Sequence, residues 1–247
     1  MRRPWSRAGG APTLAAMTTT LITGANKGLG FAAARRLIAA GHDVWAAARD
    51  ADRGRAAAEE LGARFVQLDV TDDASVAAAA ERVAAESGAL DVLVNNAGVL
   101  GALTAVPDTT ADDVAPVLAT NVLGIVRVTH AFLPLLERSE HPVVVNVSSG
   151  MGSFAVTSDP ARIESKLVGL AYPASKAAVT MLTTQYAKAL PHMRVNAVDP
   201  GYTATDFNAH RGTQTVEEGT DAVVRMAQLD ASGPTGTFID RHGAVPW

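Results

Sequence analysis

The stretch Thr19–Gly30, with the sequence TTLITGANKGLG, decides the fold. A short β-branched and aliphatic run leads into a turn with three glycines, and the Ala-rich run Phe31–Ala40 follows at once. This order predicts a buried strand, a tight turn and a helix, which together begin a parallel α/β sheet. Gly24 permits the tight turn, Gly28 lets a pyrophosphate approach the backbone, and Gly30 lets the helix pack on the strand.

A helix that begins directly after this turn is suited to bind phosphate. Its first N–H groups are free, and the positive end of the helix dipole favours an anion. Asn26, Lys27 and Leu29 lie in the same turn and are further candidates for contact with a dinucleotide. A glycine-rich turn without a ligand is the alternative, but the position directly after the first strand favours the dinucleotide.

The rest of the chain alternates short strand-like runs with longer Ala-rich runs, the pattern of strands joined by crossover helices. Expected strands span residues 19–23, 43–47, 64–68, 92–94, 143–147, 194–197 and 237–239. Expected helices span residues 30–40, 51–61, 73–87, 111–136, 172–190 and 216–229, and Pro116 and Pro134 are expected to trim or bend the fourth. We therefore predict one α/β domain over residues 18–247, with a doubly wound parallel sheet of seven strands and helices on both faces.

The composition of the 247-residue chain is globular, with 48% hydrophobic and 19% charged residues. A formal net charge of -4 and the absence of clustered Lys and Arg argue against a nucleic-acid partner. Without cysteines the chain has neither a disulfide framework nor a thiolate metal site, and a reducing cytoplasm is the simplest compartment. The six histidines include no pair at metal-ligand spacing, so we expect no metal.

The N-terminal residues 1–17 are rich in Arg, Pro, Gly and Ala and end at a second methionine, so we expect a disordered leader there. The pair Arg2 and Arg3 suggests a signal peptide instead, but no continuous apolar segment follows it. Nowhere does the chain contain about 18 consecutive apolar residues without a charge, so no membrane span is predicted.

The end of the second strand indicates which nucleotide binds. In NAD-binding sheets an acid at this position bonds the ribose 2'-OH, and its charge would repel a 2'-phosphate. Here the strand is followed by Ala48, Arg49 and Asp50. If Ala48 takes the place of the acid, Arg49 can form a forked contact with the phosphate and Lys27 adds a second cation, which favours NADP(H) over NAD(H). Alternatively, both cations are solvated and Asp50 reaches the ribose.

Further landmarks follow the expected strands or lie in the expected helices. They are Asp69-Val70, Asn95-Asn96-Ala97-Gly98, Asn121, Ser148-Ser149, Tyr172-Pro173-Ala174-Ser175-Lys176 and Pro200-Gly201. In this order, and with the Thr-Gly-x-x-x-Gly-x-Gly turn, the chain resembles the short-chain dehydrogenase/reductase family from Thr19 to its end. The resemblance implies a Rossmann-type fold and, with Arg49, an NADP(H)-dependent oxidoreductase that transfers hydride between the nicotinamide and a carbonyl or alcohol substrate.

The resemblance also implies four catalytic residues. Tyr172 would transfer the proton, and Lys176 would lower its pKa and hold the nicotinamide ribose, while Ser149 rather than Ser148 would polarise the substrate carbonyl. Asn121 would bend its helix and hold a water that relays protons to the lysine. One cation can supply the energy that this role of Lys176 requires. Lowering the pKa of a phenol from about 10 by 3 units needs about 4 kcal/mol, which is what a unit charge at about 4 Å provides. The alternatives are a surface pair four residues apart for the tyrosine and lysine, and a helix N-cap for the asparagine.

Further residues would bind the cofactor if the resemblance holds. Asp69 and Val70 would bracket the adenine, although Asp69 could instead cap the helix from Asp73. Asn96, Ala97 and Gly98 would line the cofactor with close backbone contact. The residues expected beside the nicotinamide carboxamide are Pro200, Gly201, Thr203 and Thr205. Of these, Thr203 would contact it through its backbone.

The stretch between Ser149 and Tyr172 is longer than is usual in the family. The excess, about ten residues, lies within residues 150–171, and loops of such length are usually functional or partly helical. It resembles a shorter form of the insertion in carbonyl-reductase-like members, and an insertion here can cover a dimerisation face. The long helices that begin at Ala111 and Tyr172 could form a paired-helix interface, so we predict a homodimer or homotetramer. A monomer is the alternative.

Two other functions compete with the oxidoreductase. A non-catalytic sensor that binds a dinucleotide and a protein partner would typically lack Tyr172 or Lys176, and both are present. Sugar-nucleotide epimerases use a similar pair, but they usually carry a larger domain after the position of Pro200. We expect a moderately apolar aldehyde, ketone or secondary alcohol as the substrate.

Overall fold

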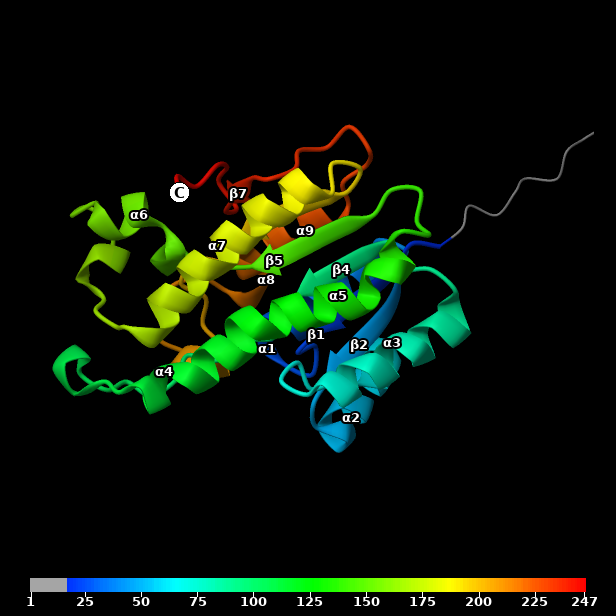
Figure 1. The fold of residues 1–247 in the computed structure, drawn as a ribbon, viewed down its shortest axis with the longest axis horizontal. Coiled ribbons are helices and arrows are strands. Elements are labelled where there is room, and N and C mark those ends of the chain that lie inside the picture. Colours follow the sequence, from blue (N-terminus) through cyan, green and yellow to red (C-terminus); the bar gives the residue numbers. More distant parts are fainter. Residues whose placement is uncertain (1–16) are drawn as a thin grey trace, which may run out of the picture.

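Seven parallel strands form the centre of the computed structural model, which describes residues 17–247 (Figure 1). The strands are β1 (Thr19–Thr23), β2 (Asp43–Ala48), β3 (Arg64–Gln67), β4 (Val92–Asn95), β5 (Val143–Val147), β6 (Arg194–Val198) and β7 (Phe238–Ile239), in the order β3-β2-β1-β4-β5-β6-β7. The predicted α/β class and the expected strands are confirmed, with bounds that agree to within one residue. Most of the expected leader, residues 1–16, lies outside the described residues.

Helices cover both faces of the sheet, so its central strands are buried throughout and are hydrophobic without alternation. Every residue of β4 and of β5 is buried. The helices α1 (Gly28–Ala39), α2 (Ala51–Leu61) and α9 (Asp221–Ala227) pack on the face that includes Ile22. The helices α3 (Asp73–Ser87), α5 (Gly124–Leu136) and α7 (Ala171–Ala189) pack on the face that includes Leu21, as Figure 1 shows.

The strand order reverses between β1 and β4. The chain runs from β1 outward to β3, crosses back to β4, and then runs outward to β7. Ligands of open parallel sheets bind at the carboxyl ends of the strands at such a reversal. The glycine turn follows β1 and residues Asn96–Gly98 follow β4, so the fold places these two motifs side by side.

The helix expected over residues 111–136 is interrupted, but not at either of the two prolines that were expected to trim or bend it. Pro116 lies inside α4 (Ala111–Leu118) and Pro134 lies inside α5, so neither proline ends a helix. Between α4 and α5 lies one π-helical turn, Ala119–Leu123, which contains Asn121. By length and composition the whole stretch could cross a membrane, but it is a core helix, with Val128 and Phe132 fully buried against the sheet.

The prediction of a single helix over residues 216–229 is also wrong. Two short helices, α8 (Val216–Gly219) and α9, meet at Thr220. The guanidinium of Arg36 donates to the carbonyl oxygen of Glu217 and to the Thr220 hydroxyl, both at 2.8 Å. A side chain from α1 therefore satisfies acceptors at the end of α8, and the helix need not continue to do so.

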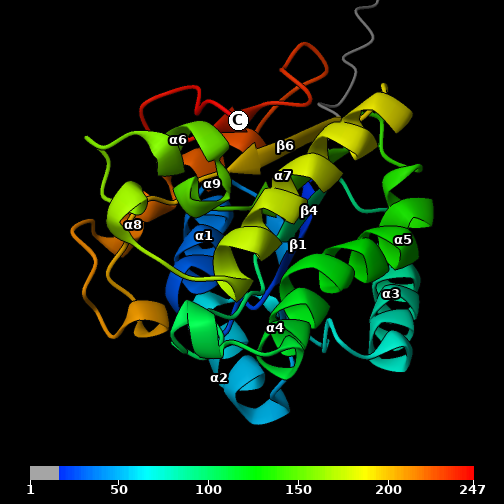
Figure 2. The same cartoon turned by 60° about the vertical axis from the view of Figure 1, so that its left-hand side comes forward.

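The insertion before α7 is partly helical. It contains a 3-10 turn at Gly150–Gly152, the short helix α6 (Phe154–Ser158) and a second 3-10 turn at Glu164–Lys166. The amide of Ala155 donates to the carbonyl of Trp247, and Figure 2 shows α6 beside the C-terminus. A Cβ on Gly152 would lie 2.5 Å from the carbonyl carbon of Lys176, so only glycine lets the insertion approach α7 this closely.

Candidate active site

The glycine turn requires glycine at each of its three positions. Gly24 and Gly28 have φ of +67° and +57°, in the left-handed region that L side chains rarely adopt. A Cβ on Gly30 would lie 2.5 Å from the carbonyl oxygen of Gly24, so only glycine at position 30 lets the start of α1 pack this closely on the turn. Helix α1 begins at Gly28, two residues earlier than expected, because the turn itself forms its first residues.

No side chain caps the N-terminus of α1, a feature that it shares with α5, α7 and α9. Its N-cap residue, Lys27, makes no capping hydrogen bond, and the first turn contains no acid. In contrast, Asp50 caps α2, Asp72 caps α3 and Thr215 caps α8. The first N–H groups of α1 therefore remain available to an anion, which fits the pyrophosphate of a dinucleotide.

Side chains between β1 and β4 brace the glycine turn. The Asn96 amide donates to the carbonyl oxygens of Thr23 and Gly24 at 2.8 and 3.2 Å. The Thr23 hydroxyl accepts from the backbone N–H groups of Asn96 and Ala97, each at 3.0 Å. The side chain of Asn96 thus holds the turn, a role that the sequence analysis did not foresee.

The end of β2 carries a cation but no free acid. Ala48 is the last residue of the strand and is buried, whereas the Arg49 side chain is 77% exposed, with its Nε 4.0 Å from Asp69. The Asp50 carboxylate accepts from the backbone N–H of Arg53 at 3.0 Å and from its guanidinium at 2.9 Å, and these bonds lower the pKa of Asp50. Because Asp50 is engaged as the cap of α2, the alternative in which it binds a ribose is disfavoured.

Lys27 has an ionic partner that the sequence did not indicate. Its Nζ lies 3.0 Å from Asp206, which follows β6 by eight residues and also accepts from His210 at 2.9 Å. The hydrogen bonds from Lys27 and His210 lower the pKa of Asp206. The segment after β6 is therefore attached to the glycine turn through an exposed ion pair.

Asp69 and Val70 follow β3 at the edge of the crevice. Asp69 accepts from the backbone and the hydroxyl of Thr71 at 2.9 and 2.7 Å, and α3 is capped by Asp72 instead, so the capping alternative for Asp69 is wrong. Val70 is buried, and a Cβ on Gly124 would lie 2.9 Å from its Cγ2. Close packing against the start of α5 fixes the position of Val70.

Asn121 is buried inside the π turn, and its side chain satisfies three backbone or side-chain groups. Its Oδ1 accepts from the Val99 amide at 2.8 Å, and its Nδ2 donates to the Val99 carbonyl at 2.9 Å and to the Ser175 hydroxyl at 3.0 Å. The N-cap alternative is therefore wrong, because the N-cap of α5 is Leu123. These bonds tie the loop after β4 to α7 through the bend in the helix.

Lys176 is buried, with 5% of its surface exposed, so the alternative of a solvated surface pair is wrong. Its Nζ donates to the Val147 carbonyl at the end of β5 at 2.8 Å and lies 5.6 Å from the centre of the Tyr172 ring. Burial lowers the pKa of Lys176 to about 8, while the charge of Asp199 acts in the opposite direction. A Cβ on Gly98 would lie 3.7 Å from this Nζ, so the loop after β4 passes directly over the ammonium.

The two serines after β5 have different environments. The Ser148 hydroxyl is buried and donates to the Lys176 carbonyl at 3.0 Å, which leaves it no free proton to donate. The Ser149 hydroxyl accepts from the Met151 amide at 3.2 Å and lies beside the Tyr172 phenol. The expectation that Lys176 lowers the pKa of Tyr172 is wrong for this structure: burial raises this pKa, and it is the Ser149 hydroxyl that opposes the effect.

The turn after β6 faces the glycine turn across the crevice. The buried Thr203 hydroxyl donates to the Pro200 carbonyl at 2.9 Å. Its backbone N–H donates to the Gly201 carbonyl and its carbonyl accepts from the Asn208 amide, both at 2.9 Å, so neither donor of Thr203 is free for a ligand. A Cβ built on Gly28 would lie 3.8 Å from the Thr205 side chain. The ring of Phe207 packs on that of Tyr172, a contact that the sequence gave no signal for because the two residues are far apart in the chain.

Comparisons with known proteins agree with this geometry. The profile of the short chain dehydrogenase family matches residues 18–215. The (+)-neomenthol dehydrogenase of Arabidopsis thaliana is 33% identical over 281 residues, which cover 90% of this chain and 95% of the plant protein. Carbonyl reductase 1 (NADPH) of Mus musculus is 35% identical over 273 residues, with 92% and 97% covered.

A solved structure shows the same fold. The crystal structure of NADPH-bound carbonyl reductase from chicken fatty liver has a TM-score of 0.82 and 26% sequence identity, and the match covers 94% of this chain and 99% of that chain. The family profile spans most of the described residues, and the relatives match over nearly their whole length. The chain therefore belongs to the short-chain dehydrogenase/reductase family, as an oxidoreductase that acts on carbonyl and alcohol groups.

Proposed function

We propose that this protein is an NADP(H)-dependent reductase of aldehydes or ketones, and the corresponding dehydrogenase of secondary alcohols, with Tyr172 as the group that transfers the proton. One observation carries the proposal. A half-buried phenol and a buried ammonium lie 5.6 Å apart, measured from the ring centre to Nζ, beside the carboxyl end of β5 and the loop after β4. Ser149 adds a hydroxyl beside the same phenol.

The preference for NADP(H) rests on the end of β2. No carboxylate stands at Ala48, Asp50 is engaged by Arg53, and Arg49 extends into solvent, where it can bind a 2'-phosphate. Lys27 is the second cation. The mouse relative is named for NADPH, and the chicken structure contains it.

The remaining cofactor contacts follow from position in the crevice. Gly24, Asn26, Gly28, Leu29 and Gly30 would hold the pyrophosphate at the uncapped start of α1. The residues proposed for the adenine are Asp69 and Val70, those proposed for the nicotinamide side are Asn96, Ala97, Gly98, Pro200, Gly201, Thr203 and Thr205, and Tyr172 and Lys176 would contact the nicotinamide ribose.

Three side chains have separate roles in the reduction, namely Tyr172, Lys176 and Ser149. NADP(H), when bound, supplies the hydride in reduction and accepts it in oxidation. Burial raises the pKa of Tyr172, so the phenol is protonated at neutral pH, which is the state that can donate a proton to the substrate oxygen. The ammonium of Lys176 then stabilises the phenolate that remains, and Ser149 donates a hydrogen bond to the substrate oxygen.

Asn121 would support this chemistry from a distance. A Cβ on Gly98 would lie 3.4 Å from Asn121 Oδ1 and 3.7 Å from Lys176 Nζ, so one glycine separates the two side chains. We assign Asn121 the positioning of the loop after β4 over the ammonium, and the relay of protons through a water near the lysine.

A substrate of moderate polarity fits the mixture of apolar and polar residues around the site. The names of relatives include a neomenthol dehydrogenase and a carbonyl reductase. The test is a thermal-shift comparison of NADP(H) with NAD(H), followed by a screen for NADPH consumption on aldehydes, open-chain ketones and monocyclic terpenoid ketones. A larger shift with NAD(H) would refute the cofactor preference, and tight NADPH binding without turnover on any of them would favour a sensor instead.

The oligomeric state and the compartment stay predictions. Val126 on α5 and Met181 on α7 are exposed apolar side chains on the helices that we expect to pair between subunits. A mass of one chain by light scattering would rule out the predicted dimer or tetramer.

A further inference from the structure

The segment after β7 folds back along the open edge of the sheet. Ala244 forms an antiparallel bridge with β7, and the Val245 amide donates to the Phe238 carbonyl at 2.8 Å. The ring of Trp247 packs on the ring of Phe238, with centroids 5.7 Å apart. We call residues 244–247 the strap, since they cover the edge strand and lie beside α6 (Figure 2).

Ser153 is the residue of the insertion that binds the strap. Its buried hydroxyl donates to the Pro246 carbonyl at 2.5 Å and, as the N-cap of α6, accepts from the Val156 amide at 3.0 Å. The Ala155 amide donates to the Trp247 carbonyl at 3.2 Å. The start of α6 is therefore bonded to the strap at two successive carbonyl groups.

An apolar cluster closes the same contact. Val156 of α6 and Val245 of the strap are buried with Phe238 of β7 and Ala197 of β6. The hydrophobic effect stabilises such a contact, and close-packed side chains transmit a displacement of one to its neighbours. The strap thus connects the insertion to the core beside the sheet.

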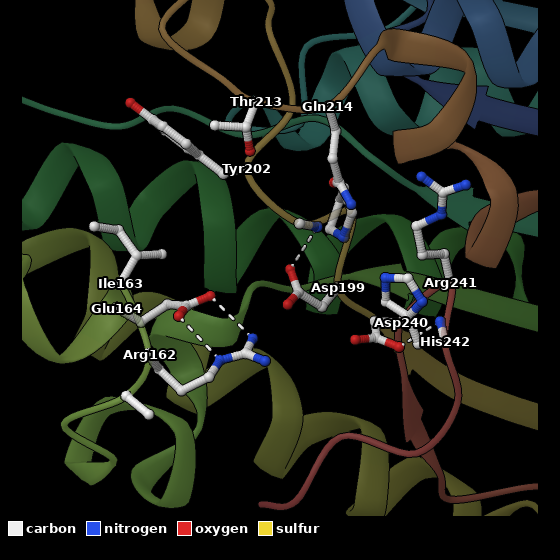
Figure 3. A pocket seen from close by; sticks show the side chains of 13 residues that line it. Arg162, Ile163, Glu164, Asp199, Tyr202, Thr213, Gln214, Asp240, Arg241 and His242 are labelled. Carbon is white, nitrogen blue, oxygen red and sulfur yellow. Dashed lines mark hydrogen bonds and ion pairs between the residues drawn. The ribbon is translucent and has the colours of Figure 1, made fainter.

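Beyond α6 the insertion stands apart from the segment after β7. Figure 3 shows Arg162 and Glu164 on one side of a cavity of about 300 Å³, and Asp240 and His242 on the other. Within residues 17–247 no hydrogen bond or ion pair joins these two sides, because Arg162 pairs with Glu164 and Asp240 accepts from the amides of its own turn. The strap is therefore where the segment after β7 holds the insertion.

One tight turn connects Ser153 to Ser149, four residues earlier. The Gly152 amide donates to the Ser149 carbonyl at 2.8 Å, and the Ser153 amide donates to the Gly150 carbonyl at 3.0 Å. The Met151 amide donates to the Ser149 hydroxyl at 3.2 Å, which occupies a lone pair of Oγ and leaves its proton for the substrate oxygen. The turn thus fixes the direction of the Ser149 hydroxyl, and a displacement of Ser153 would change it.

We propose that Ser153 is a positioning residue for carbonyl reduction: by binding the strap at Pro246, it holds the turn that directs the Ser149 hydroxyl at the substrate oxygen. This inference rests on the proposed function. It gives the strap a role in the rate of the reaction as well as in stability, because a displacement of about 1 Å in a reacting group lowers the rate by about a hundredfold.

The test is a double-mutant cycle on kcat for carbonyl reduction, with Ser153→Ala, Ser149→Ala and the double variant, at a temperature where circular dichroism shows all of them folded. Ser153→Ala removes the bond to the strap and should lower kcat by about tenfold, as for a displacement of well under 1 Å. Without the Ser149 hydroxyl nothing is left to direct, so in the Ser149→Ala background the same change should lower kcat by less than about twofold.

Ser87→Ala is the matched control. The Ser87 hydroxyl accepts from the Trp45 indole at 3.0 Å, at the end of α3 that leads into the start of β4, so it lies at the opposite edge of the sheet from the site. Its loss should lower the melting temperature and leave kcat unchanged in both backgrounds. A purely structural role of Ser153 would give the same result.

Equal losses of kcat from Ser153→Ala in the two backgrounds, or no loss in either, would overturn the inference. If Ser153→Ala does not fold, Trp247→Ala weakens the strap through its packing on Phe238 and should lower kcat only where Ser149 is present. Failure of both variants to fold would assign the strap to folding alone and would also overturn the inference. Failure of the proposed function looks different, because the wild type would then not consume NADPH with any carbonyl compound, or Ser149→Ala would keep the full rate.

Discussion

The rings of Phe207 and Tyr172 pack on each other, with centroids 5.6 Å apart and an angle of 57° between their planes. Phe207 lies in the segment after β6, next to Asp206, which pairs with Lys27 of the glycine turn. Two adjacent residues of one segment therefore contact the proposed proton donor and the proposed phosphate site. Phe207 is 42% exposed, which leaves it accessible to an apolar substrate.

Replacing Phe207 with Ala should raise KM for an apolar ketone and lower kcat/KM by about tenfold, because an aromatic contact of about 1 kcal/mol and part of the apolar wall are lost. The melting temperature should stay close to that of the wild type, since the side chain is partly exposed. Phe207→Leu keeps the apolar wall and should retain most activity. Steady-state kinetics on both variants test this, and an unchanged KM in Phe207→Ala would place the substrate elsewhere.

Replacing Arg49 with Ala should weaken NADPH binding by about tenfold and leave NADH binding unchanged, because a charge-assisted contact to the 2'-phosphate is worth about 1.5 kcal/mol or more. Arg55→Ala is the matched control, since Arg55 is also exposed but pairs with Asp52, which has no part in the cofactor argument. Fluorescence titration of both nucleotides gives the two ratios. Equal losses for NADPH and NADH would refute the role assigned to Arg49.

Replacing Asp206 with Asn should tighten NADPH binding by about threefold. Lys27 must leave Asp206 to reach the phosphate, and an exposed ion pair of this kind is worth up to about 1 kcal/mol. His210→Ala removes the other partner of Asp206 without touching Lys27 and should have little effect. Weaker binding in Asp206→Asn would show that the carboxylate helps the cofactor and does not compete with it.

The two serines after β5 should respond differently to alanine. Ser149→Ala should lower kcat by about a hundredfold with little change in melting temperature, because a donor to the substrate oxygen is lost. Ser148→Ala should instead lower stability by about 1 kcal/mol, since the buried carbonyl of Lys176 loses its hydrogen-bond donor. Thermal unfolding and turnover, measured on both, separate these effects, and the reverse pattern would exchange the two roles.

Much of the fold could be predicted because its strands are short, buried on both faces and bounded by polar or glycine residues. The glycine turn, the end of β2 and the spacing of Tyr172 and Lys176 are local patterns, and the parallel sheet places all of them at the carboxyl ends of its strands. The π turn at Asn121 could not be located, because it depends on bonds to Val99 and Ser175 that only the folded chain brings together.

The contacts that the sequence analysis missed are all between distant segments. Phe207 on Tyr172, Asp206 on Lys27 and Arg36 on Thr220 join residues that no helix or strand periodicity relates. The same holds for the bond from Ser153 to the Pro246 carbonyl.

The most direct test of the account is the Tyr172→Phe variant, with NADPH binding and turnover measured on the same preparation. The substitution removes only the hydroxyl, so NADPH should bind within about twofold of the wild type, while the rate of carbonyl reduction should fall by about a thousandfold, in the range of general acid catalysis. A variant that binds NADPH and reduces the same ketone at the wild-type rate would contradict the central claim that Tyr172 transfers the proton.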